Sequence, residues 1–239
     1  MLTLGSMYVL NPILRLPDDP DTVIWKYMDL SKFLDLLLSR RLFMARSDKF
    51  EDQYEGTFSE PTFEEMKRLS ADNPGFLQYY KSHREKVVVS SWHINEYESF
   101  AMWQIFTKTN EGLAICSTVN RLKNALEPEQ LTTQYIGEVN YIDYKKEFIP
   151  FEDDFFPFLF KRKSFQYERE IRVLTDMSSS GQYINDGIKI DVNICELIDK
   201  IYIHPKSENW YKKLVIDLLD KLGFDFRIEK SDLESEILI

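Results

Sequence analysis

The residues best suited to chemistry lie in one charged stretch, residues 161–172, which reads Lys-Arg-Lys-Ser-Phe-Gln-Tyr-Glu-Arg-Glu-Ile-Arg. Glu168 and Glu170 are two positions apart, so a strand that begins at residue 168 would place both carboxylates on one face. Lys161 lies just upstream. Paired carboxylates beside basic residues suit a metal ion, a cationic ligand or divided acid and base roles. The alternative is a solvated edge strand with ordinary ion pairs.

A second acidic group occurs at Glu51, Asp52 and Glu55. As functional residues they would bind a metal or contact a substrate, and otherwise they form a solvated loop. Combined with the charged stretch, they would also compose a metal-dependent phosphodiesterase. In such an enzyme carboxylates hold magnesium and a lysine stabilises the phosphoryl transition state.

Two of the predicted elements, the strand at 87–92 and the helix at 98–106, carry aromatic side chains. Trp92, Trp103 and Phe106 would line a pocket that stacks a base or nicotinamide, and the alternative is that they are plain core. His93 is the histidine best placed to act as an acid or base, and the alternative is that it has a structural role. The chain has 3 histidines, scattered and without an HExxH motif, which disfavours a zinc site.

Composition narrows the function classes. With 44% hydrophobic residues, the 239-residue chain can form a core. Its net charge of −10 disfavours binding to nucleic acid or to anionic membranes. Neither phosphate-binding glycine motif, GxGxxG or GxxxxGK[ST], occurs. Two unspaced cysteines, Cys116 and Cys195, no signal peptide and no long apolar run predict a cytoplasmic protein without membrane association.

The periodicities predict an α+β fold in one domain, residues 23–239, after an extended lead-in over residues 1–22. Strands are expected at 23–27, 42–45, 87–92, 113–117, 135–144, 168–175, 187–192, 201–205 and 224–228. Helices are expected at 30–38, twice within 60–86, and at 98–106 and 120–126. A last helix is expected after the cap Ser207, up to residue 222, with Trp210, Leu214, Leu218 and Leu222 on one stripe. The C-terminal strand, helix and strand predict a parallel pair joined by a right-handed crossover, so the sheet is mixed with flanking helices.

Several motifs, in order, resemble a bacterial family known as domain of unknown function 2971. They are Trp-Lys-Tyr at 25–27, Phe-Glu-Asp-Gln-Tyr-Glu at 50–55, Ser-Ser-Trp at 90–92, Met-Trp-Gln-Ile-Phe at 102–106, Glu-Gly at 111–112, Lys161 and Tyr-Glu-Arg-Glu-Ile-Arg at 167–172. The resemblance covers roughly residues 24–233. The chain departs from the family where Glu-Asp-Gln replaces Asn-Asp-Pro at 51–53 and where Phe165 replaces Trp. The family name implies no activity.

A looser likeness links the chain to ADP-ribosyltransferases of the Arg-Ser-Glu type. Lys26, the serines at 90–91 and the Glu-x-Glu at 168–170 occur in that order. The likeness implies a basic group on the NAD pyrophosphate, a serine that orients a ribose, and a carboxylate that stabilises the oxocarbenium-like transition state. Lys26 departs from the arginine of that class, because lysine cannot make a planar bidentate contact.

The leading hypothesis is therefore an enzyme that binds NAD or a related nucleotide and acts as an ADP-ribosyltransferase or NAD glycohydrolase. Glu170 and Glu168 are the expected catalytic residues, a protein target is a further expected partner, and no metal is expected. The expected NAD contacts are Lys26, Tyr27, Ser90, Ser91, Trp92, Trp103, Lys161 and Arg172. One alternative is a non-catalytic interaction or sensor module, and the other is the metal-dependent phosphodiesterase.

Two geometric expectations follow. The segments that carry Lys26, residues 90–92 and residues 168–172 should come together around one pocket. Trp103 should be buried near residues 168–170, because its helix offers apolar neighbours. Of the two glutamates, Glu170 is expected to matter more, since it adjoins the apolar run 171–174 and should be less hydrated.

Overall fold

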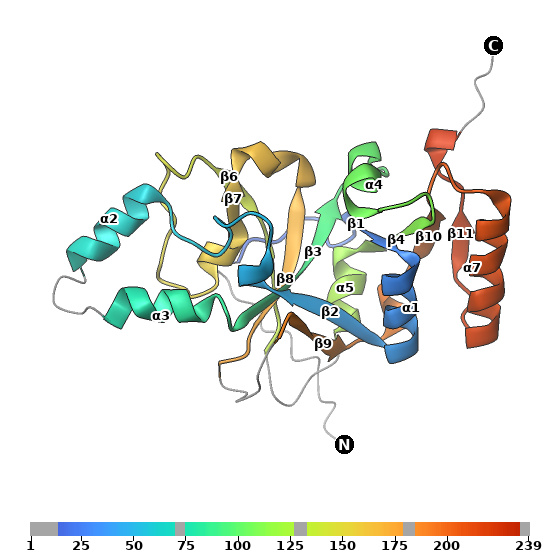
Figure 1. Cartoon of the computed structure of the whole chain (residues 1–239), viewed down its shortest axis with the longest axis horizontal. Coiled ribbons are helices and arrows are strands. Elements are labelled where there is room, and N and C mark those ends of the chain that lie inside the picture. Colours follow the sequence, from blue (N-terminus) through green and yellow to red (C-terminus); the bar gives the residue numbers. More distant parts are fainter. Residues whose placement is uncertain (1–13, 70–74, 127–132, 179–184, 235–239) are drawn as a thin grey trace, which may run out of the picture.

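The computed structural model describes residues 14–69, 75–126, 133–178 and 185–234. It confirms the α+β prediction: helices surround a large sheet in which parallel and antiparallel pairs both occur (Figure 1). The helices are α1 (Leu30–Ser39), α2 (Glu60–Leu69), α3 (Gly75–His83), α4 (Phe100–Phe106), α5 (Val119–Ala125), α6 (Ile194–Leu197) and α7 (Asn209–Leu222). The strands are β1 (Val23–Asp29), β2 (Arg41–Arg46), β3 (Val87–Ile94), β4 (Gly112–Thr118), β5 (Tyr135–Glu138), β6 (Asn140–Ile142), β7 (Phe160–Arg162), β8 (Glu170–Asp176), β9 (Gly187–Asp191), β10 (Lys200–Ile203) and β11 (Arg227–Glu229).

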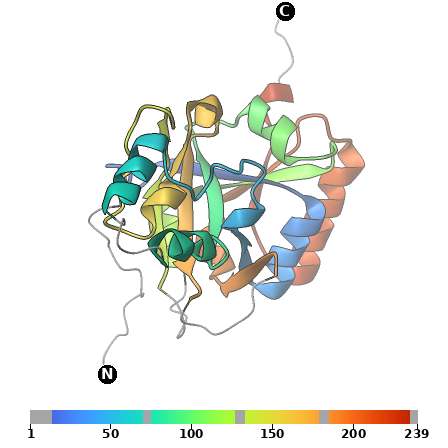
Figure 2. The same cartoon turned by 60° about the vertical axis from the view of Figure 1, so that its left-hand side comes forward.

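The main sheet has the strand order β11-β10-β4-β1-β3-β2-β9, with β8 paired to β3 and β5 paired to β8. β10 and β11 are parallel and α7 connects them, which confirms the predicted C-terminal strand-helix-strand unit. α1 and α7 lie side by side at one end of the molecule, and α2 and α3 lie at the other (Figures 1 and 2).

The sheet opens at the middle of β3. One edge of β3 pairs with β8 along seven residues, from Val87 to His93. On the other edge, β2 pairs only with Val88 and Val89, and β1 pairs only with His93 and Ile94. The intervening residues 90–92 thus have no ladder partner on that edge among the described strands. β1 and β2 diverge there, because β1 continues along β4 and β2 along β9.

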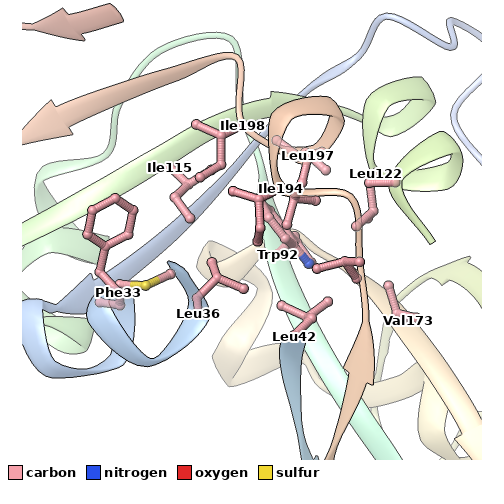
Figure 3. Packing of buried hydrophobic residues seen from close by; sticks show 14 of the residues in the cluster. Phe33, Leu36, Leu42, Trp92, Ile115, Leu122, Val173, Ile194, Leu197 and Ile198 are labelled. Carbon is pink, nitrogen blue, oxygen red and sulfur yellow. The ribbon is translucent and has the colours of Figure 1, made fainter. Parts of the chain in front are cut away.

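Alternation along β1 divides the core between two sheet faces. Ile24 and Met28 join the largest apolar cluster, which is covered by α1, α5, α6 and α7. Trp25 and Tyr27 point to the opposite face and pack with Met102 of α4. Figure 3 shows Trp92 of β3 inside the larger cluster, surrounded by apolar side chains that include Leu36, Leu42, Ile194 and Leu197.

Several local expectations need correction. The strand expected at 135–144 divides into β5, which pairs with β8, and β6, which pairs with β7 and ends at Ile142. Helix α7 begins after Glu208, not after Ser207. Residues 1–13 of the predicted lead-in lie outside the described residues, whereas Leu14 is buried in a smaller apolar cluster with strands β3 and β8.

Helix α7 also buries a different face from the expected one. The stripe expected to pack included Trp210 and Leu214, yet these side chains are exposed. The buried residues are Tyr211, Val215 and Leu219. Gly223 ends the helix with φ +76°, as a left-handed C-terminal glycine should.

Candidate functional site

A cavity of about 740 Å³ lies at the opening beside β3. Its lining combines β1, β3 and β8 with the loop before α2 and with side chains of α1 and α4. The expectation that the three separate segments meet around one pocket is confirmed. Of the predicted catalytic residues and NAD contacts, those that line the cavity are Lys26, Tyr27, Ser90, Ser91, Trp92, Lys161, Glu168, Glu170 and Arg172.

Lys26 bridges the opening from β1 to β3. Its ammonium donates to the Ser90 hydroxyl at 3.1 Å and to the Ser91 carbonyl at 2.9 Å. The Ser91 carbonyl is available because no strand pairs with that part of β3 on this edge. The ammonium also lies 5.3 Å from the centroid of the Trp92 ring, so a cation–π contact helps to hold it. Burial, and then the nearby charge of Lys32, lower the pKa of Lys26 to about 8.

The opposite wall carries a buried network of ion pairs centred on Lys161. The Lys161 ammonium lies 3.1 Å from Glu55 and 2.9 Å from Glu170, and it also donates to Glu168. β7 supplies the lysine, β8 supplies Glu170, and the loop before α2 supplies Glu55. One ammonium therefore joins the neighbouring segments β7 and β8 to the loop before α2, which is distant in sequence.

Arg172 completes this network from β8. Its guanidinium donates to both oxygens of Glu170, at 2.8 and 3.1 Å, to Glu55, and to the Phe158 carbonyl at 2.7 Å. Arg172 is only 1% exposed, so these acceptors replace its hydration. The sequence motif had suggested a ligand contact, but the donors of Arg172 reach protein acceptors.

The network contains three carboxyl groups, Glu55, Glu168 and Glu170, against two cations, Lys161 and Arg172. One carboxyl is therefore left without a compensating charge, and protonation relieves this. Burial, and then the adjoining Glu170, raise the pKa of Glu168 to about 8. Burial alone would also raise the pKa of Glu170, but Arg172 and Lys161 outweigh it and hold that pKa well below its usual range.

The sequence argument that placed both glutamates on one strand face is wrong in its premise. β8 begins at Glu170, and Glu168 ends the 3-10 turn Lys163–Glu168. Arg169 between them has φ +42°, a left-handed conformation that is uncommon for a residue with a side chain. It is held by the hydrogen bond from the Ile94 amide to its carbonyl, at 2.7 Å. The two carboxyls meet through this turn and through Lys161 instead of through strand alternation.

The alternative of a solvated acidic loop holds for Glu51, which is exposed, but it is wrong for Asp52 and Glu55, which are buried. Asp52 is 6% exposed and forms a bidentate pair with Arg162, at 2.9 and 3.1 Å. Glu55 is 4% exposed and belongs to the ion network. The signal in the sequence was Phe50 at the start of the motif, because this partly buried side chain packs against the apolar cluster of β3 and β8, whereas Tyr54 is exposed.

Trp103 is buried as expected, but it does not line the cavity. Its indole donates to Glu98 at 2.8 Å, and its ring packs edge-on against Tyr27 and His204. Tyr27 therefore separates Trp103 from His93, which pairs with Glu170 across β3 and β8. The apolar environment of α4 makes Trp103 a core residue, and its expected contact with a ligand is not supported by this position.

Trp92 also differs from the expected stacking surface. Its ring is 1% exposed and belongs to the core (Figure 3). The aromatic side chains exposed at the cavity are instead Phe43 of β2 and Phe106 of α4, at 46% and 45%. Sequence reasoning included Phe106 among the pocket aromatics and missed Phe43, whose strand pattern gave no reason to single it out.

His93 has a structural role at the site, which was the expected alternative to acid–base work. Its Nδ1 lies 2.6 Å from the Glu168 carbonyl, so Nδ1 carries the proton that is donated. Burial is the main cause that lowers the pKa of His93. The imidazole is therefore neutral near pH 7 and fixes the backbone of Glu168, just before the left-handed turn.

The carboxyl groups do not form an open metal site. Among the described residues, no group of three or more His, Cys, Asp or Glu side chains is arranged to hold a metal ion. The Lys161 ammonium occupies the centre of the three glutamates, where a cation would bind. These contacts give the phosphodiesterase hypothesis no positive support.

Comparison with known proteins adds no assignment: no family model matches the chain, and neither does any curated protein. The helices of the described ranges include none with the length and apolar character needed to cross a membrane.

Proposed function

We propose that this protein cleaves the bond between nicotinamide and ribose in NAD or a related nucleotide, and transfers the ADP-ribose to water or to a protein acceptor. The observation that carries the proposal is the meeting of Lys26, Ser90 and Glu170 at one cavity. These are the basic, hydroxyl and carboxylate groups that the ADP-ribosyltransferase likeness requires. We also propose, from the ordered motifs in the sequence, that the chain belongs to the domain of unknown function 2971 family. A cytoplasmic location is proposed from the cysteine pattern and the lack of a long apolar run.

Lys26 is the group suited to the pyrophosphate. Two of its three N–H bonds are directed to neutral acceptors on β3, which leaves one for a ligand. Lys32 lines the same cavity, so a second positive charge is close. Two neighbouring cations attract a diphosphate and repel each other without it, which favours binding of an anion over the empty state.

Glu170 is suited to stabilise positive charge on the reacting ribose. It stays ionised because Arg172 and Lys161 lower its pKa, and these partners fix its position. A fixed negative charge needs no reorganisation as the oxocarbenium character develops. The partners also reduce the net charge of the wall, so the contribution expected from Glu170 is about a hundredfold in rate.

Glu168 is suited to accept a proton from the nucleophile. Nicotinamide departs from NAD as a neutral molecule and needs no acid, whereas an attacking water or hydroxyl must lose a proton. With a pKa of about 8, Glu168 is a stronger base than an ordinary glutamate. The two carboxyls thus have separated pKa values, as pairs with separate acid–base roles commonly do.

The direct experiment supplies NAD to the purified protein and measures free nicotinamide by chromatography, with and without added protein acceptors. We expect nicotinamide release that depends on Lys26, so that Lys26→Met raises the KM for NAD more than it lowers kcat. The absence of both NAD binding and nicotinamide release would instead favour the non-catalytic module. In that case the role of Glu170 would be structural, since both of its oxygens already have protein partners.

A further inference from the structure

Lys26 differs from two other lysines at the cavity, Lys161 and Lys189, in its partners. Lys161 contacts three carboxylates, and Lys189 pairs with Asp35 at 2.5 Å. The ammonium of Lys26 forms no ion pair with any carboxylate of the described residues, and its hydrogen bonds go to the neutral oxygens of Ser90 and Ser91. A partly buried amine on the cavity wall therefore has no carboxylate in contact, and the charge of Glu170, which favours the protonated form, acts more weakly than burial and Lys32.

The neutral form of Lys26 is accordingly accessible near neutral pH. Burial and the charge of Lys32 lower the pKa to about 8, against 10.5 for an ordinary lysine. Roughly a quarter of Lys26 is then neutral at pH 7.5, compared with about one in a thousand for an exposed lysine. A neutral amine is a nucleophile, and lowered pKa values of this kind activate lysines toward carbonyl compounds.

We propose that Lys26 is a carbonyl-reactive amine that condenses with an aldehyde or ketone carrying an anionic group. The amine nitrogen adds to the carbonyl carbon, and the carbonyl oxygen gains a proton. That proton comes from the amine, and the second amine hydrogen then leaves with the resulting hydroxyl as one water molecule, so that a carbon–nitrogen double bond remains. No oxidant or reductant takes part. The Ser90 hydroxyl, 3.1 Å from the nitrogen, is positioned to relay a proton.

The anionic group is assigned from Lys32. This side chain lines the same cavity and, within the described part of the chain, forms no ion pair. A ligand that carries its carbonyl group to Lys26 can present a phosphate or carboxylate to this second cation. The cavity of about 740 Å³ has room for such a small molecule.

The test uses pyridoxal 5′-phosphate with cyanoborohydride at pH 7.5, followed by mass spectrometry of tryptic peptides. We expect Lys26 to be labelled at least about tenfold faster than Lys189, which lines the same cavity but is ion-paired. Pyridoxal without the phosphate should label Lys26 more slowly. Equal labelling of the two lysines would overturn the proposal, and equal rates for the two reagents would overturn the anionic part.

Two variants and the pH dependence complete the test. Without cyanoborohydride, pyridoxal 5′-phosphate and the wild-type protein should give a fast rise in imine absorbance. Lys26→Arg keeps a cation and should abolish this fast rise, whereas Lys189→Arg should retain it. Thermal melting confirms that both variants fold. If Lys26→Arg does not fold, Lys26→Gln replaces it. The wild-type rate should level off above about pH 8. A rate that climbs steadily to pH 10 contradicts the proposal. NAD is absent throughout, so a negative result here does not affect the proposal that the protein cleaves NAD. Likewise, a failure to cleave NAD does not affect the proposal that Lys26 reacts with carbonyl groups.

Discussion

The two walls of the cavity hold buried charge in opposite ways. On the β8 side, Glu55, Glu170, Lys161 and Arg172 each have partners of opposite charge. On the β1 side, Lys26 has only a hydroxyl and a carbonyl for its proton donors. A buried pair that loses one member is strongly destabilised, because a charge is left uncompensated. The comparison teaches that the network mainly holds three segments together, whereas Lys26 is free to respond to a ligand.

The largest expected effect comes from breaking the network. Arg172→Met should lower the free energy of unfolding by about 3–5 kcal/mol, because Glu55 and Glu170 lose a buried partner. Urea denaturation measures this. The matched control is Arg41→Met, which removes an arginine from an exposed pair with Asp191 and should cost about 1 kcal/mol or less. Similar costs for the two variants would mean that the network does not organise the fold.

A smaller effect, about tenfold per pH unit, is expected in the pH profile of kcat/KM for NAD. Glu168 must lose its proton to act as a base, so the rate should rise with pH up to about 8. Lys26 loses its charge above about pH 8, so binding should weaken there. The two walls together predict a bell with its maximum near pH 8.

Two variants separate the limbs of this bell. Glu168→Gln should remove the acid limb while lowering the rate, and Lys26→Arg should remove the alkaline limb, because arginine stays charged. A profile that is flat from pH 6 to 10 would show that neither wall titrates during the reaction.

The smallest effect concerns stability at the β1 wall. The pKa of Lys26 is about 8 when folded and 10.5 when unfolded, so the unfolded chain binds more protons between these values. Stability should therefore rise with pH in this window, by roughly 1–2 kcal/mol. Lys26→Met should change stability near pH 7 by about 1 kcal/mol or less and should lack this rise. Denaturation at pH 8 and pH 10 checks the sign, and a fall in the wild type relative to the variant would contradict it.

The sequence predicted the elements better than their faces. Strand β3 and the crossover of β10, α7 and β11 have strong local patterns, and both were predicted. The buried stripe of α7 was misassigned by one position, because Trp210 and Tyr211 both look apolar and only the packing partner selects between them. Local periodicity does not contain that choice.

The candidate site was predicted in part for a similar reason. Lys26, Ser90 and Glu170 were named from the order of motifs, and the sheet does bring them to one cavity. The role of Glu55 was missed because its contacts with Lys161 and Arg172 join residues more than a hundred positions apart. The opening beside β3 was missed too, since it depends on where β1 and β2 stop pairing.

The most direct measurement compares NAD turnover by Glu170→Gln and Glu55→Gln. Each variant removes one carboxylate that contacts both Lys161 and Arg172, so the two should lose similar stability. We predict that Glu170→Gln lowers turnover about a hundredfold with little change in the Kd for NAD, whereas Glu55→Gln stays within about fivefold of the wild type. Equal turnover in the two variants, or no turnover by the wild type, would contradict the account.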